Sequence, residues 1–245
     1  MNYIFYILLG FAPSIIWLSF YLKKDKRPEP KQMVLKIFFW GMLITLPVFF
    51  IELGLTSELN NLLPSIFNKI LCWFVGVALI EETMKFLVVK YKVLKNQEFD
   101  EPVDAMIYMI IVALGFASLE NILVLFSNEN FLFLENVIII LFVRFIGATF
   151  LHALSSGVLG YFLALSIYET KKRLSLLFKG LISATLLHGL FNIIIIEIGE
   201  SFLNQHFLTF IFLSGLIVVI LSGVSFFVGF GFRKIKTFKS VCKTN

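Results

Sequence analysis

Charged residues are scarce in this sequence. Asp, Glu, Lys and Arg make up 15% of its 245 positions and hydrophobic residues 59%, whereas soluble domains have about 25% charged and about 45–50% apolar residues. A water-soluble fold cannot hide so much apolar surface, but a lipid bilayer removes the need to hide it. The shortage of charge therefore excludes an ordinary soluble domain and predicts a membrane protein.

Other features are also missing. The two cysteines, Cys72 and Cys242, have neither disulfide-framework nor metal-site spacing. The apolar runs lack the alternation of a membrane β-barrel, so helices are expected. No Gly/Ser-rich or Pro-rich linker and no internal repeat divides the chain. The first apolar run has no positive flank before it and no cleavage-site pattern, so we expect a true span rather than a signal peptide.

Seven apolar segments reach spanning length. They cover residues 3–22, 33–53, 67–90, 103–126, 136–168, 179–197 and 207–231. We therefore predict an all-α polytopic transmembrane bundle with about seven spans. One transmembrane domain would occupy residues 1–232, and a basic tail would occupy residues 233–245.

Basic residues gather in alternate loops. All Lys and Arg residues except Lys69, Lys85 and Arg144 fall after the first, third, fifth and last segments. The opposite loops hold acidic residues instead, among them Glu52, Glu58, Glu197 and Glu200. The positive-inside rule then places the N-terminus outside and the C-terminus in the cytoplasm. The net charge of +5 follows from this loop bias, and the lipid bilayer is the expected partner rather than a nucleic acid.

The fifth segment, residues 136–168, is too long for an upright span. As a helix it would measure about 50 Å, against a hydrocarbon core of about 30 Å. It must tilt, protrude or break. The sequence Ser155-Ser156-Gly157 is the expected weak point.

Ionisable residues within the apolar segments carry the functional argument. Each such group costs about 2.5–3.5 kcal/mol at bilayer depth, so it needs a partner or a function. The third segment contains Glu81, Glu82 and Lys85, and we expect Lys85 to neutralise Glu81 at i,i+4 and leave Glu82 without a local partner. The other segments add further polar side chains, namely Asp104, Tyr108, Glu120, Asn121, Arg144, His152, Ser156, His188 and Asn192.

These residue types fit two classes of protein. His and carboxylate side chains are ligands of Zn²⁺, and a carboxylate beside the metal can act as the general base of a hydrolase. The same side chains could form the relay of an ion- or proton-coupled transporter. The chain shows neither an inverted repeat nor paired broken helices of the transporter type, so the residues lean only slightly towards catalysis.

Four motifs, in order along the chain, resemble those of a known family. Glu81-Glu82-Thr83-Met84-Lys85 matches an EExxK motif, and Phe116 with Glu120 matches an FxxxE motif. The third and fourth motifs begin at His152 and at His188-Gly-Leu-Phe-Asn192. Together they resemble the PrsW family of membrane proteases, which is related to the type II CAAX prenyl endopeptidases. The match spans about residues 10–195.

The resemblance implies a bacterial site-1 protease. Such an enzyme lies in the cell membrane and clips a single-pass substrate such as an anti-sigma factor, starting regulated intramembrane proteolysis in a stress response. By motif position, Glu81 and Glu82 would hold or activate the catalytic water, and Lys85 would orient them. Glu120 and His152 would share the water or a metal, and His188 with Asn192 would bind metal or stabilise the oxyanion. Asn192 stands where the best-known member has Asp, so a charged role there is in doubt.

Two questions stay open at the level of sequence. Glu120, His152 and His188 form the expected metal set, with Zn²⁺ possible, but paired acids and bases could also work without a metal. In upright helices the motif residues would be spread over about 10 Å in depth. Either tilts and a break in segment 136–168 close that gap, or some motif residues do not touch the substrate.

Overall fold

The fold was obtained as a computed structural model, which describes residues 3–24, 27–62, 65–127 and 134–238. All regular elements within these ranges are helical, so the all-α prediction is confirmed. The elements are α1 (Tyr3–Leu22), α2 (Lys31–Leu62), α3 (Ser65–Leu71), η1 (Cys72–Leu79), α4 (Ile80–Lys92), α5 (Asp104–Ser127), α6 (Leu134–Ile146), α7 (Ala148–Tyr168), η3 (Thr170–Lys172), α8 (Arg173–Leu203) and α9 (Phe207–Ile235).

Six helical stretches in the described ranges are long and apolar enough to cross a membrane. The predicted segment 67–90 is not among them, because it consists of α3, the π-helix η1 and α4, with 7, 8 and 13 residues. These three pieces nevertheless follow one another without a gap from Ser65 to Lys92. π-Helical turns are rare and are frequently found at functional sites, and here the π-helix ends at Leu79, two residues before Glu81.

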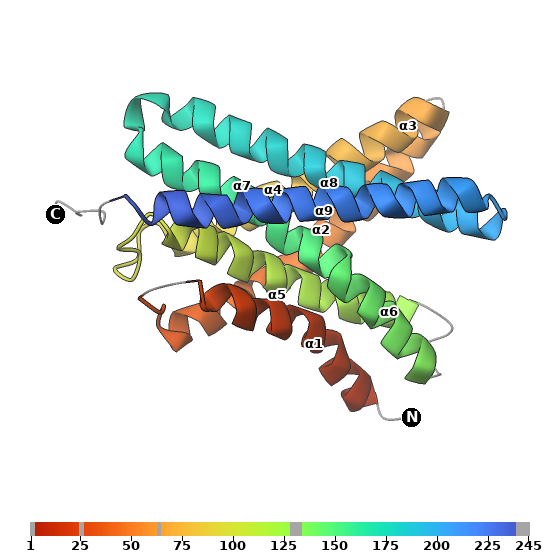
Figure 1. Cartoon of the computed structure of the whole chain (residues 1–245), viewed down its shortest axis with the longest axis horizontal. Coiled ribbons are helices and arrows are strands. Elements are labelled where there is room, and N and C mark those ends of the chain that lie inside the picture. Colours follow the sequence, from red (N-terminus) through yellow and green to blue (C-terminus); the bar gives the residue numbers. More distant parts are fainter. Residues whose placement is uncertain (1–2, 25–26, 63–64, 128–133, 239–245) are drawn as a thin grey trace.

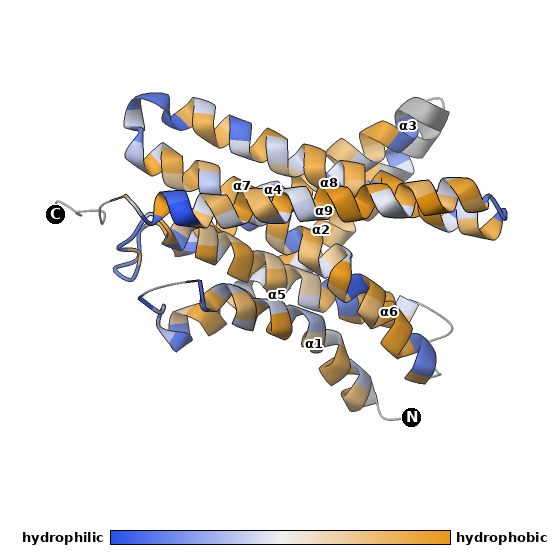
Figure 2. Ribbon diagram, in the orientation of Figure 1, coloured by the Kyte–Doolittle hydropathy of each residue, from blue (hydrophilic) through white to orange (hydrophobic). Residues whose placement is uncertain are grey.

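The helices run side by side along the long axis of the bundle (Figure 1). Hydrophilic residues gather at its two ends (Figure 2). The α4–α5 connection and the end of α9 lie together with the start of α2, and Arg27 pairs with Glu101 there at 3.0 Å. The side chain of Lys236 donates to the carbonyl of Lys24 at the same end. We call this end the basic end and the opposite one the acidic end.

Helix α5 forms the centre of the bundle. Nearly every residue from Asp104 to Ser118 is buried, whereas α9 exposes large apolar side chains such as Val219 and Phe226, as a lipid-facing helix does. Glycine allows α2 to approach α5 very closely. A Cβ on Gly115 would lie 2.0 Å from the carbonyl oxygen of Phe38, and one on Gly41 would lie 2.2 Å from that of Val112.

The long fifth segment does break, but at a different place from the one predicted. Gly147, with φ −105° and ψ −95°, separates α6 from α7. A Cβ at Gly147 would lie 2.9 Å from the carbonyl oxygen of Val143, so glycine suits the bend. The predicted break at Ser155-Ser156-Gly157 is wrong, because these residues lie buried within α7. His152 lies within α7, after this break, and is buried.

The predicted boundary between residues 232 and 233 falls inside α9, which continues to Ile235. The part of the basic tail from residue 239 onwards lies outside the described residues.

Candidate active site

The side chain of Glu82 lies at the centre of the site and is completely buried. Its Oε1 accepts from Lys85 at 3.0 Å and Ser155 at 3.0 Å, and it lies 3.0 Å from Nδ1 of His188. Its Oε2 accepts from Ser156 at 2.9 Å. Donors from α4, α7 and α8 thus converge on one carboxylate. Because both oxygens of Glu82 are already occupied by these donors, Glu82 suits a role in positioning its neighbours better than contact with substrate.

Lys85 differs from its predicted role. The spacing predicted that Lys85 pairs with Glu81 and leaves Glu82 without a local partner. That expectation is wrong, because Nζ of Lys85 lies 2.9 Å from Glu81 and 3.0 Å from Glu82. It also lies 3.0 Å from Nδ1 of His152 and 4.4 Å from the ring centroid of Phe116. The fully buried ammonium therefore bridges two helices.

Neighbouring carboxylates determine which nitrogen of each histidine ring carries the hydrogen. Nδ1 of His188 faces Glu82 at 3.0 Å, and Nε2 of His152 faces Glu120 at 2.7 Å. A ring nitrogen facing a carboxylate carries the hydrogen, so the other nitrogen keeps its lone pair. The lone pairs are then on Nδ1 of His152 and Nε2 of His188. The two rings meet edge to face, with centroids 4.9 Å apart.

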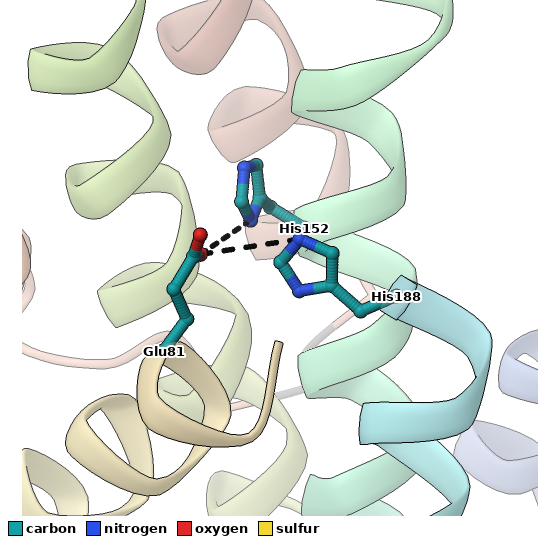
Figure 3. A group of neighbouring side chains, drawn as sticks. All are labelled: Glu81, His152 and His188. Atoms are coloured by element: carbon teal, nitrogen blue, oxygen red, sulfur yellow. Dashed lines mark ion pairs between the residues drawn. The ribbon is translucent and has the colours of Figure 1, made fainter. Parts of the chain in front are cut away.

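Glu81 completes a cluster with the two histidines (Figure 3). Its Oε2 lies 3.7 Å from Nδ1 of His152 and 4.0 Å from Nε2 of His188. The three side chains each offer a ligand atom, and these atoms lie within 4.8 Å of one another. Glu81 comes from α4, His152 from α7 and His188 from α8, so the cluster exists only in the folded bundle.

The donor set fits a metal ion. Two imidazoles and one carboxylate are the protein ligands of many catalytic zinc sites, where a fourth position stays open. Metal-binding histidines usually donate their other N–H to a carboxylate, as both do here. Lys85 occupies part of the same space, because it donates to both Glu81 and His152. A metal held by these three residues would have to displace those two hydrogen bonds.

The predicted metal set contained Glu120 where the geometry brings Glu81. Glu120 lies on the opposite ring edge of His152 and pairs with Arg144 at 3.1 Å. Nε of Arg144 also donates to Asn121 at 2.5 Å, and Asn121 contacts Thr149 and the carbonyl of Gly10. Arg144 thereby holds the second motif in place from the end of α6.

Two cavities meet at these groups. One, of about 320 Å³, is bordered by both histidines, Arg144 and Asn192. The other, of about 460 Å³, runs between α2 and α5 and is bordered by Thr45 and Phe126. Both are also bordered by four shared residues, namely Phe49, Glu52, Glu81 and Glu120. Glu81, rather than Glu82, is therefore the member of the pair that faces open space.

Glu52 is a residue of the site that sequence reasoning missed. It was assigned to a loop at the acidic end, which is wrong because α2 continues to Leu62. Glu52 is half-buried on the cavity wall, with its carboxyl group within hydrogen-bonding reach of Glu81. The available signal was an acidic residue about one helical turn after Phe49 in an apolar run.

Of the other predicted residues, Asn192 borders the cavity of the two histidines. The structure thus brings Glu81, Glu120, His152, His188 and Asn192 around one cavity and places the fully buried Lys85 and Glu82 behind it. The motif side chains therefore meet, although upright helices would spread them over about 10 Å in depth.

A family model described as PrsW family intramembrane metalloprotease matches residues 29–223. The chain belongs to this family. It is 33% identical to Protease PrsW of Bacillus subtilis over 237 residues, covering 96% of each protein. It is 35% identical to Protease PrsW of Oceanobacillus iheyensis over 189 residues, covering 76% of this chain and 80% of that protein. No solved structure matches it.

Membership in the PrsW family decides between the two classes that the residues left open. The chain is a bacterial multi-pass membrane protease, and the transporter alternative loses its support. The family description as a metalloprotease agrees with the cluster of Glu81, His152 and His188, which could hold a metal.

Proposed function

We propose that this protease hydrolyses a peptide bond of a single-pass membrane protein in the cavity bordered by Glu81, His152 and His188. The observation that carries the proposal is the meeting of two histidines and a carboxylate, with their lone pairs directed together, on the wall of a 320 Å³ cavity. Peptide hydrolysis at this depth needs a site that admits water, activates it and stabilises the oxyanion.

The metal would be held by Glu81, His152 and His188, and Zn²⁺ is the ion that this ligand set favours. When bound, it would supply Lewis-acid polarisation of the scissile carbonyl. Glu82 and Glu120 would each fix one histidine by accepting its other N–H. Lys85 would hold Glu82 and keep the buried negative charge balanced.

The remaining groups on the cavity wall suit the proton and oxyanion steps. Glu52 borders both cavities and lies beside Glu81, so we assign to it the removal of a proton from the attacking water. Glu120 is already engaged by His152 and Arg144, which suits orientation better. The side-chain amide of Asn192 would donate a hydrogen bond to the developing oxyanion.

The position of the cavities supports a first cleavage from outside the cell. Both lie towards the acidic end of the bundle, since they are bordered by Glu52 in the second half of α2 and by Ser127 at the end of α5 or Ile195 in the second half of α8. The charge pattern predicts that this end faces outwards. A membrane-anchored anti-sigma factor, cleaved at its outer side, is the substrate that the family resemblance favours.

A cellular cleavage assay tests the proposal. A tagged single-pass anti-sigma factor and a tagged unrelated single-pass protein would be expressed with the native chain, with Glu81→Gln or with His188→Ala, at matched levels. Glu58→Gln, an exposed substitution on α2, is the control. We expect a clipped fragment of the anti-sigma factor with the native and control chains only. Equal cleavage by all four chains would contradict the assigned site, and cleavage of the unrelated protein alone would contradict the substrate.

A further inference from the structure

A third cavity lies at the basic end of the bundle. It has a volume of about 500 Å³ and opens between α4, α7 and α8. Its walls are apolar and include Phe86 of α4, Leu159 and Leu163 of α7, and Leu177 and Leu181 of α8. It shares no bordering residue with the two cavities around Glu81. It is therefore separate from the cavities of the candidate active site.

Two cations stand at the rim of this cavity. Lys90 is in the last turn of α4, and Arg173 is the first residue of α8. Both are exposed, and neither pairs with a carboxylate within the ranges that the structure describes. Below them, Leu174 and Phe178 project outwards, with 72% and 63% of their surface exposed. The arrangement is an apolar groove with positive charge at one end.

We propose that this cavity binds an anionic phospholipid from the leaflet at the basic end. The acyl chain would lie against the leucines of α7 and α8, and Lys90 and Arg173 would hold the phosphate group. Charge complementarity selects this occupant, because basic pockets between membrane helices on the positively charged side bind anionic headgroups. Arg can also contact a phosphate through two parallel hydrogen bonds.

The location gives the lipid a structural role. The cavity lies between the end of α4, which carries Glu81, and the packed pair of α7 and α8, which carry His152 and His188. An acyl chain filling it would join α4 to α7 and α8 by apolar contact. Lipid binding to the folded state alone raises its stability, so the bundle that positions the cluster should be more stable in anionic than in neutral lipid.

Lipid retention by the full-length protein tests this proposal. The protein in detergent would receive phosphatidylglycerol or phosphatidylcholine with identical acyl chains, and bound lipid would be counted by native mass spectrometry. We expect phosphatidylglycerol to be retained by the native chain and to bind roughly 25-fold more weakly to K90Q/R173Q, because each cation contributes about fivefold. The control K95Q/K171Q removes two exposed cations of the same end that do not border the cavity.

A second variant tests the apolar part of the site. Leu177→Trp narrows the cavity and leaves all charges in place, so we expect it to reduce the retention of phosphatidylglycerol while Lys90 and Arg173 remain. Equal retention of the two lipids by the native chain would overturn the proposal. Equal losses in K90Q/R173Q and K95Q/K171Q would also overturn it, since they would indicate attraction to the charged surface alone. None of these readouts depends on proteolytic activity.

Discussion

The ammonium nitrogen of Lys85 lies 3.0 Å from Nδ1 of His152. The same nitrogen lies 2.9 Å from Oε2 of Glu81, so it donates to two of the three side chains assigned to the metal. Lys85 and a cation are alternatives at these atoms. If a metal were held there, Lys85 would retain Glu82 as its partner, and without the metal Lys85 also neutralises Glu81.

This alternative predicts that metal removal will stop catalysis without unfolding the protein. A structural zinc domain unfolds when a chelator removes its ion, but here Lys85 remains to neutralise the carboxylates. We expect chelation to abolish cleavage and to lower the midpoint of thermal unfolding by only a few degrees. Parallel cleavage and thermal-shift measurements check this. Loss of cooperative unfolding after chelation would contradict it, and so would full activity in a sample shown to be free of metal.

Metal binding should depend on His152 and His188 but not on His206. His152→Ala and His188→Ala each remove a ligand, and we expect affinity losses of at least about tenfold, since even the loss of a supporting group costs about 10- to 100-fold. His206 lies before α9, outside the cluster, and His206→Ala is the matched control. Elemental analysis of the purified proteins gives the measurement. Equal metal content in all three variants would refute the ligand assignment.

Substitutions of Glu81 and Glu82 should have different effects on stability and on activity. Glu82→Ala leaves Lys85 without one of its partners and also removes the carboxylate partner of Ser156 and His188, so we expect a loss of roughly 3–5 kcal/mol of stability. Glu81→Gln faces the cavity and leaves Lys85 paired with Glu82. It should therefore abolish cleavage with little change in thermal unfolding. The opposite order of stabilities would contradict the positioning role of Glu82.

Glu52 should be needed for the reaction. Loss of a positioned acid or base usually costs between about 10²- and 10⁴-fold, and we expect Glu52→Gln to lower the cleavage rate within that range. Glu58→Gln makes the same change on the exposed part of α2 and should leave the rate unchanged. Rates should be compared in purified protein at saturating substrate. A native rate in Glu52→Gln would remove this residue from the mechanism.

Much of the fold could be predicted because the bilayer makes apolar length decisive. The segment predicted for residues 3–22 coincides with α1, and the other segments overlap the observed helices closely, apart from the break at Gly147. The break could not be placed from sequence, because it depends on Gly147 having no Cβ, which would lie 2.9 Å from the carbonyl oxygen of Val143, whereas Ser155 and Ser156 have hydroxyl partners across the bundle. The predicted segment 33–53 stopped nine residues before the end of α2 at Leu62, so Glu52 at its edge was counted with the loop residues.

The sequence indicated which residues gather at the candidate site but not how their side chains are arranged there. The motif residues meet, as their scarcity in apolar segments suggested. Which carboxylate faces the cavity depends on the direction in which α4 packs, and a sequence spacing of one residue between Glu81 and Glu82 does not contain that information. Long-range pairs such as Lys85 with His152 likewise follow from the packing of α4 against α7.

Cleavage by the purified protein tests the central claim most directly. The native chain, His188→Ala and His206→Ala would be reconstituted with a single-pass peptide that carries a fluorescent tag on each side of its span. The account predicts a defined pair of fragments from the native chain and from His206→Ala, and none from His188→Ala. Fragments of the same size and rate from His188→Ala would contradict it, because the peptide bond would then be hydrolysed without the cluster of Glu81, His152 and His188.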